Sequence, residues 1–100
     1  MYIKVIHRAF ESTPYTAAVV DCPTDNPEEA CEYAYRWTQN IMDSWSMNGA
    51  ADGNDRVEVV KALHVDESGK TWGHRSTSMG DQMLLGTTKY KVAAVGFEPI

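Results

Sequence analysis

The sequence lacks a long hydrophobic run. No stretch of its 100 residues approaches the roughly 20 consecutive apolar residues that a membrane-spanning helix requires. The first ten residues alternate polar and apolar side chains, without the apolar segment that marks a signal peptide. The length is that of one ordinary domain. We therefore expect a single domain over residues 1–100, located in the cytoplasm and independent of membranes.

Cysteine is scarce as well. Cys22 and Cys31 are the two cysteines present, far fewer than in a small secreted domain held together by disulfides. A bridge between them stays an alternative, although a cysteine within a predicted helix is more typical of a small buried apolar residue. The cysteines and histidines lack the paired spacing of zinc sites, and the acidic loop 52–55 lacks the alternating ligands of a calcium loop. We expect no metal and no cofactor.

Positive charge is in short supply in the first half of the chain. Residues 1–55 hold nine acids against three bases, whereas residues 56–100 hold five acids against six bases, and the whole chain carries a formal charge of −5. Nucleic-acid binding that ignores sequence depends on Lys and Arg to neutralise phosphates. The acidic balance therefore makes nucleic acid a possible but not a favoured partner.

The pattern of apolar residues predicts five strands and one helix. Alternating side chains and turn residues indicate strands over 2–10, 15–21, 56–65, 82–85 and 89–95, with a Gly/Asn/Asp-rich loop over 48–55. The order strand, strand, helix, strand, strand, strand is typical of an α+β domain. We expect a mostly antiparallel sheet of four to five strands covered by one long helix.

The helix has the clearest signals. Asn26 is a good capping residue, Pro27 suits the first helical position, and Glu29 stands where a capping box has an acid. Apolar residues then recur at spacings of three and four: Ala30, Ala34, Trp37, Ile41 and Trp45. This stripe predicts a helix over 27–44, with its two tryptophans as the central side chains of the core.

The segment 71–81 contains the densest group of candidate ligand-binding residues. They are His74, Arg75, Ser76, Ser78 and Asp81. Hydroxyls, backbone N–H groups and a guanidinium together suit an anion. The segment has no P-loop signature, and Ser76 replaces the first glycine of the nucleophile-elbow motif. We favour the alternative that it is a structured connection, and we expect no catalytic residues and no enzyme, although an enzyme built on His74 with Asp81 stays a third hypothesis.

Two further surfaces are candidates for partners. One strand face combines aromatic rings with bases, as sheets that stack nucleobases do; it holds Tyr2, Lys4, Arg8 and Phe10, with Lys89, Lys91 and Phe97 nearby. The polar side of the helix carries Tyr33, Tyr35 and Arg36, residue types that are enriched at protein–protein contacts.

Residues 75–81, Arg-Ser-Thr-Ser-Met-Gly-Asp, are followed by Tyr90, Val92 and the pair Gly96-Phe97. This C-terminal pattern resembles that of small uncharacterised proteins encoded by bacteriophages and bacterial mobile elements, and residues 40–46 have the look of the phage members. The resemblance implies a phage or mobile-element origin and a place in the host cytoplasm. It implies no activity.

These observations lead to a functional hypothesis by subtraction. We expect a non-enzymatic phage accessory protein that binds a macromolecular partner, namely a host protein. The alternative is a module that binds nucleic acid or a phosphate ligand through the loop 74–81. Homodimer formation stays open.

Overall fold

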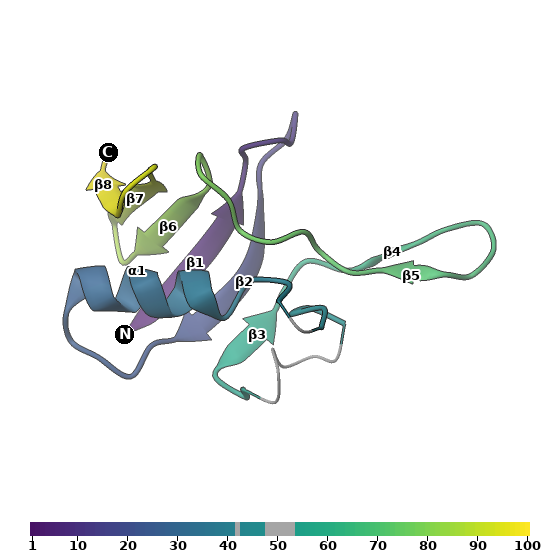
Figure 1. The fold of residues 1–100 in the computed structure, drawn as a ribbon, viewed down its shortest axis with the longest axis horizontal. Helices are drawn as coiled ribbons and strands as arrows, with labels where there is room; N and C mark the ends of the chain where they lie inside the picture. The colour runs from purple at the N-terminus through teal and green to yellow at the C-terminus, as the bar shows by residue number, and fades with distance from the viewer. Residues whose placement is uncertain (42, 48–53) are drawn as a thin grey trace.

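A computed structural model describes residues 1–41, 43–47 and 54–100, and Figure 1 shows its arrangement. The elements in chain order are β1 (Tyr2–His7), β2 (Tyr15–Asp21), α1 (Pro27–Arg36), β3 (Val57–Val59), β4 (His64–Val65), β5 (Thr71–Trp72), β6 (Gln82–Leu85), β7 (Thr88–Val92) and β8 (Phe97–Pro99). Residues 48–53 of the predicted loop over 48–55, which include the first two residues of the acidic loop 52–55, lie outside the described residues.

Six strands form one sheet in the order β3-β2-β1-β6-β7-β8, with antiparallel pairing between all neighbours. Figure 1 shows α1 lying across one face of this sheet, where it packs on β1. Strands β4 and β5 form a separate two-stranded ribbon that projects away from the sheet. The α+β class and the antiparallel sheet are confirmed.

The predicted number of strands was too low: two predicted runs end early, and the short strand β5 lies in a segment for which no strand was predicted. The run 56–65 is not one strand, because β3 pairs with β2 and the chain then leaves the sheet before β4 begins. The run 89–95 ends early at Val92, and a turn closed by the Ala93 N–H bond to the Gly96 carbonyl leads into β8. Gly96 has φ of 72°, which a residue with a side chain rarely adopts.

The predicted helix was too long. Its start is confirmed, since the Asn26 side chain accepts a hydrogen bond from the Glu29 N–H at 3.1 Å. The helix ends at Arg36 because the next side chains satisfy its last carbonyls: Thr38 Oγ1 donates to the Ala34 carbonyl at 2.8 Å, and Gln39 Nε2 donates to the Tyr35 carbonyl at 2.9 Å. The chain then turns away.

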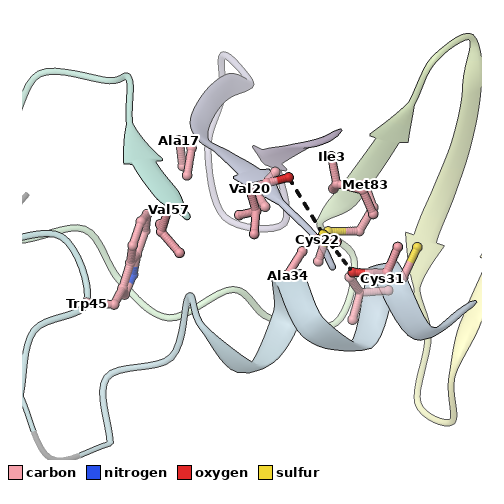
Figure 2. Packing of buried hydrophobic residues seen from close by; sticks show 13 residues of the cluster. Ile3, Ala17, Val20, Cys22, Cys31, Ala34, Trp45, Val57 and Met83 are labelled. Atoms are coloured by element: carbon pink, nitrogen blue, oxygen red, sulfur yellow. Dashed lines mark hydrogen bonds between the residues drawn. The ribbon is translucent and has the colours of Figure 1, made fainter. Parts of the chain in front are cut away.

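The core lies between α1 and the sheet (Figure 2). The sheet contributes Ile3, Val5, Val20, Val57 and Met83, and the helix contributes Ala30, Cys31 and Ala34. The two alanines place no bulk between the helix and β1, so the two elements approach closely. Trp45 fills the space beyond the end of the helix and is completely buried.

The remaining side chains of the predicted stripe lie elsewhere. Trp37 is only partly buried at the edge of the core, so its predicted role as a central side chain was wrong, while that of Trp45 is confirmed. Ile41 is 71% exposed, because the chain is no longer helical when it reaches that position.

Both cysteines are buried free thiols, so no disulfide joins them. Cys22 Sγ donates to the carbonyls of Ala30, at 3.3 Å, and Val20, at 3.6 Å, as the dashed lines in Figure 2 show. Burial raises the pKa of Cys22 and of Cys31 to about 11. Both thiols therefore serve packing, because a thiol needs ionisation to be a good nucleophile or ligand.

The two tryptophans should differ sharply in their contribution to stability. We expect Trp45→Ala to lower the free energy of unfolding by about 3–5 kcal/mol, because it empties a fully buried site. Trp37→Ala should cost clearly less, since part of that side chain already contacts water. Urea denaturation of both variants measures the difference, and equal losses would contradict the assignment of Trp45 as the central side chain.

Candidate functional site

The guanidinium of Arg75 uses all five of its N–H donors inside the protein. Nε and one terminal nitrogen bind the two oxygens of Glu11 at 2.9 and 2.8 Å. The terminal nitrogens also bind both oxygens of Asp81, at 2.7 and 2.8 Å, and the Ser76 carbonyl at 2.9 Å. Asp81 and Glu11 hold the pKa of Arg75 above its ordinary value. No N–H of this side chain remains for an anion.

Asp81 is the buried partner in this network. Besides Arg75, its carboxylate accepts the N–H groups of Arg8, Ala9 and Ser78 at 2.8, 2.9 and 2.8 Å. Burial alone would raise the pKa of Asp81, but the hydrogen bonds from the guanidinium and the three N–H groups outweigh it and hold the pKa at about 2. The carboxylate therefore joins the end of β1 to the start of β6.

The hydroxyls of the loop also bond to the protein itself. Ser76 Oγ accepts the Asn40 N–H at 2.8 Å, and Ser78 Oγ donates to the Ser76 carbonyl at 3.1 Å. Thr77, between them, is buried and bonds to Thr38 Oγ1 at 2.8 Å. These contacts match those of a structured connection, since the polar groups satisfy backbone rather than face an open cleft.

His74 does not join the other candidate ligand-binding residues. Its Nε2 lies 2.8 Å from the Lys61 carbonyl, and its ring packs between Tyr15 and Trp45, with centroid distances of 5.6 and 5.8 Å. The carboxylate of Asp81 is meanwhile occupied by Arg75 and backbone N–H groups. The residues proposed as an acid–base pair therefore have separate partners.

His7, for which no role was predicted, is completely buried at the end of β1. Its Nε2 lies 3.0 Å from Thr77 Oγ1, and its Nδ1 lies 3.3 Å from the Tyr15 hydroxyl. Burial is the main reason that the pKa of His7 falls from 6.5 to about 4. The alternation of Ile3, Val5 and His7 along β1 was the signal that places this side chain in the core.

The proposed partner-binding residues of the helix point in different directions. The Tyr33 hydroxyl accepts a hydrogen bond from Asn54 Nδ2 at 2.8 Å, and its ring packs on Trp37. The Arg36 guanidinium lies over Trp37 as well, 4.5 Å from the ring centroid. Tyr35 instead packs edge-on against Phe97 of β8, with a centroid distance of 6.2 Å. These three side chains therefore form no single patch.

Tyr35 and Phe97 border a hollow of about 560 Å³ between the helix and the turn from β7 to β8. A second hollow of about 340 Å³ lies on the other side of Phe97, next to Pro27, Tyr90 and Pro99. We call the two together the α1–β8 groove. The lining of the larger hollow is Glu32, Tyr35, Met79, Val92, Ala93, Ala94, Gly96 and Phe97. Tyr35 and Phe97 were predicted to belong to different surfaces, because nothing in the local sequence indicates that they are in contact.

The chemistry of this lining suits binding. Its ionisable side chains are Glu32 and Tyr35, which share no hydrogen bond in the described structure, and no histidine, cysteine, serine or lysine accompanies them among the residues that line the larger hollow. A general acid and base, or a nucleophile with its base, needs at least two such groups within hydrogen-bonding distance. Apolar side chains with few polar groups are instead typical of surfaces that bind by excluding water.

Of the proposed nucleobase-stacking residues, Tyr2, Lys4, Lys89 and Lys91 lie on the sheet face opposite α1. The predicted strand 2–10 was too long: β1 ends at His7, so Arg8 and Phe10 lie beyond the sheet, and the Arg75 guanidinium lies 4.9 Å from the Phe10 ring centroid. Lys4 pairs in register with Leu84, and Leu84 with Lys89, so the two lysines lie in one row. Phe97 was wrongly grouped with them, because it packs on the helix side of the sheet. Acids lie on this same face as the lysines: Lys91 Nζ is 3.5 Å from a carboxylate oxygen of Glu98. The face is mixed in charge rather than basic.

Within the described part of the chain, no group of three or more His, Cys, Asp or Glu side chains is arranged to hold a metal ion. No helix among the described residues is long and apolar enough to cross a membrane. No protein-family model, no curated protein and no solved structure matches the chain. The surfaces of the protein itself are therefore the guide to its function.

Removing Arg75 should destabilise the fold, in contrast to removing an exposed arginine. We expect Arg75→Ala to cost about 3–5 kcal/mol of unfolding free energy, because it leaves the buried carboxylate of Asp81 without its counter-charge. Arg56→Ala is the matched control: its pair with Asp21 is over 40% exposed on both sides and should contribute about 0–1 kcal/mol. Urea denaturation of both variants decides, and similar small losses would refute the structural role of Arg75.

His7 should make the protein less stable in mild acid. Its pKa is lower in the folded state than the ordinary 6.5, so as pH falls the unfolded chain takes up the proton first. We expect the contribution of His7 to stability to be fully present above about pH 7. By pH 5 the free energy of unfolding should have fallen by about 2 kcal/mol. The variant His7→Gln, which cannot be protonated, should show a flatter dependence. A wild-type curve as flat as that of the variant would contradict this assignment.

Proposed function

We propose that this protein acts without catalysis, by binding a protein partner in the α1–β8 groove. The resemblance of residues 75–81 to phage-encoded proteins supports the further proposal that it is a phage accessory protein whose partner belongs to the host cell. The groove supports the first proposal through its size, its apolar lining and its rim.

The size and lining of the groove match an anchoring side chain. A hollow of about 560 Å³ has room for one or two large apolar side chains, and binding sites commonly measure about 300–1,000 Å³. Protein interfaces derive most of their affinity from a few such anchors, often Trp, Tyr or Arg, that fill well-packed hollows. Met79, on the rim, is 61% exposed and unbranched, so it can adjust to the anchor.

The charge around the groove indicates which anchors fit. Glu32 borders the larger hollow and Glu28 the smaller one, one helical turn apart on α1. Two carboxylates beside an apolar hollow attract a partner whose anchor has a Lys or Arg next to it. The partner that fits is therefore a segment with a large apolar or aromatic residue and a neighbouring cation.

The partner's main chain does not need to extend the sheet. The Ile100 N–H bonds to the Lys89 carbonyl, and Gly96 accepts from Ala93, so these residues face β7. The backbone N–H and C=O groups of Phe97 and Pro99, which alternate with these residues, face the unpaired edge of β8. Pro99 has no N–H to donate there. Recognition through side chains in the groove is the arrangement that this edge favours.

Site-specific photo-crosslinking tests the proposal. A photoreactive amino acid replaces Ala94, an exposed residue that lines the groove, or Thr87, an exposed control at the opposite end of β7. We expect a discrete crosslinked protein from position 94 and none from position 87 in cells that make the protein. Adding Phe97→Ala should reduce the crosslink by about tenfold or more, since it removes the wall of both hollows. Equal labelling from both positions, or full labelling in a folded Phe97→Ala protein, would refute the proposal.

A further inference from the structure

The ribbon made by β4 and β5 projects from the body of the protein, at the opposite end from β8 (Figure 1). Its paired residues are His64 with Trp72 and Val65 with Thr71. Directly paired residues share a face of a ribbon and successive residues alternate, so Trp72 lies on one face and Val65 on the other. Trp72 is 50% exposed and Val65 is 56% exposed. An arm with apolar side chains exposed on both faces suits insertion into a partner.

The tip of this arm is held in one conformation. Asp66 Oδ1 accepts the N–H groups of Ser68 and Lys70, each at 2.9 Å, and the Ser68 hydroxyl at 2.6 Å. Asp66 Oδ2 accepts the indole N–H of Trp72 at 3.0 Å. A two-stranded hairpin is marginally stable by itself, and these bonds supply the order that packing cannot. The indole is thus fixed before any partner arrives, which lowers the entropy cost of binding.

The base of the arm is held as well. The His74 N–H donates to Ser46 Oγ at 2.7 Å, and His74 Nε2 lies 2.8 Å from the Lys61 carbonyl. Gly73 packs so closely on Ser44 that a Cβ at this position would collide with the serine hydroxyl. The arm therefore leaves the body in a set direction and does not fold back over the sheet.

The arm and the groove have complementary chemistry. Lys70 Nζ lies 4.2 Å from the centroid of the Trp72 ring, so the exposed aromatic residue has a cation beside it. The groove combines an apolar hollow bordered by Tyr35 and Phe97 with the carboxylate of Glu32. An anchor with a neighbouring cation is the ligand that the groove fits, and the arm presents both.

We infer that one partner of the α1–β8 groove is the arm of a second copy of this chain, with Trp72 in the hollow and Lys70 beside Glu32. This inference depends on the proposed function of the groove. The arm projects at the opposite end of the molecule from β8, whose residues line the groove (Figure 1), so the contact forms between molecules. Because the arm and the groove are different surfaces, each copy can give one contact and receive another. Such head-to-tail contacts produce chains or closed rings.

Sedimentation over a range of concentrations tests self-association. We expect the weight-average mass of the wild-type protein to rise above the monomer value of 11.2 kDa as its concentration approaches about 1 mM. Trp72→Ala and Phe97→Ala, each alone, should weaken association by about 30-fold, as loss of a central aromatic anchor does. A wild-type protein that stays at 11.2 kDa throughout would overturn the inference.

An equimolar mixture of the two variants is the decisive part of the experiment. Trp72→Ala keeps an intact groove, and Phe97→Ala keeps an intact arm. The mixture should form a dimer with one good contact and grow no further, whereas each variant alone stays monomeric. Failure of the mixture to dimerise, with both variants folded by circular dichroism, would overturn the head-to-tail arrangement.

A charge exchange covers the case in which Phe97→Ala fails to fold. Glu32 and Lys70 are both exposed, so Glu32→Lys and Lys70→Glu should leave the fold intact. Each alone should weaken association, and the double variant should restore it. A double variant no better than the singles would count against the pairing. If the wild-type protein is monomeric but a photoreactive residue at position 94 still crosslinks another protein, self-association alone is refuted. If neither self-association nor crosslinking is observed, the groove is refuted as a binding site.

Discussion

The ion pair between Arg75 and the buried Asp81 is the interaction on which the rest of the structure depends. The carboxylate of Asp81 also accepts the N–H groups of Arg8 and Ala9, so it joins the end of β1 to the start of β6, the strand next to β1. A buried charge is tolerated only when such bonds satisfy it completely. The network therefore explains why a loop rich in hydroxyls and charge has a structural role.

This use of polar groups leaves apolar features at the surface. Several reactive side chains are used inside the protein: the buried thiols have raised pKa values, His7 bonds to Thr77, and the guanidinium of Arg75 is saturated. Two of the apolar features at the surface are the groove beside α1 and the arm that presents Trp72. Both suit contacts between proteins, since such contacts depend on a few large apolar anchors rather than on activated groups.

Local signals predicted the parts of the fold that depend on nearby residues. The capping side chain of Asn26 lies three residues from the N–H it binds, and the first hairpin follows from alternation and a turn. The end of the helix was missed because Thr38 competes for its carbonyls, and a continuing apolar stripe does not reveal that competition. Tyr35 and Phe97 of the groove were both singled out from the sequence. Their contact could not be predicted, because the two residues are far apart in the chain.

The sequence by itself determined the class of fold, the antiparallel pairing of its first strands and the start of the helix, because these depend on spacing and capping over a few residues. Tertiary structure alone decided which partners the charged and hydroxyl side chains of residues 74–81 find. Arg75 and Glu11 are 64 positions apart, and Phe97 reaches the helix only after Gly96 turns the chain. Whether a charged or aromatic side chain binds a partner or the protein itself depends on such distant contacts, since the same residue type can satisfy either.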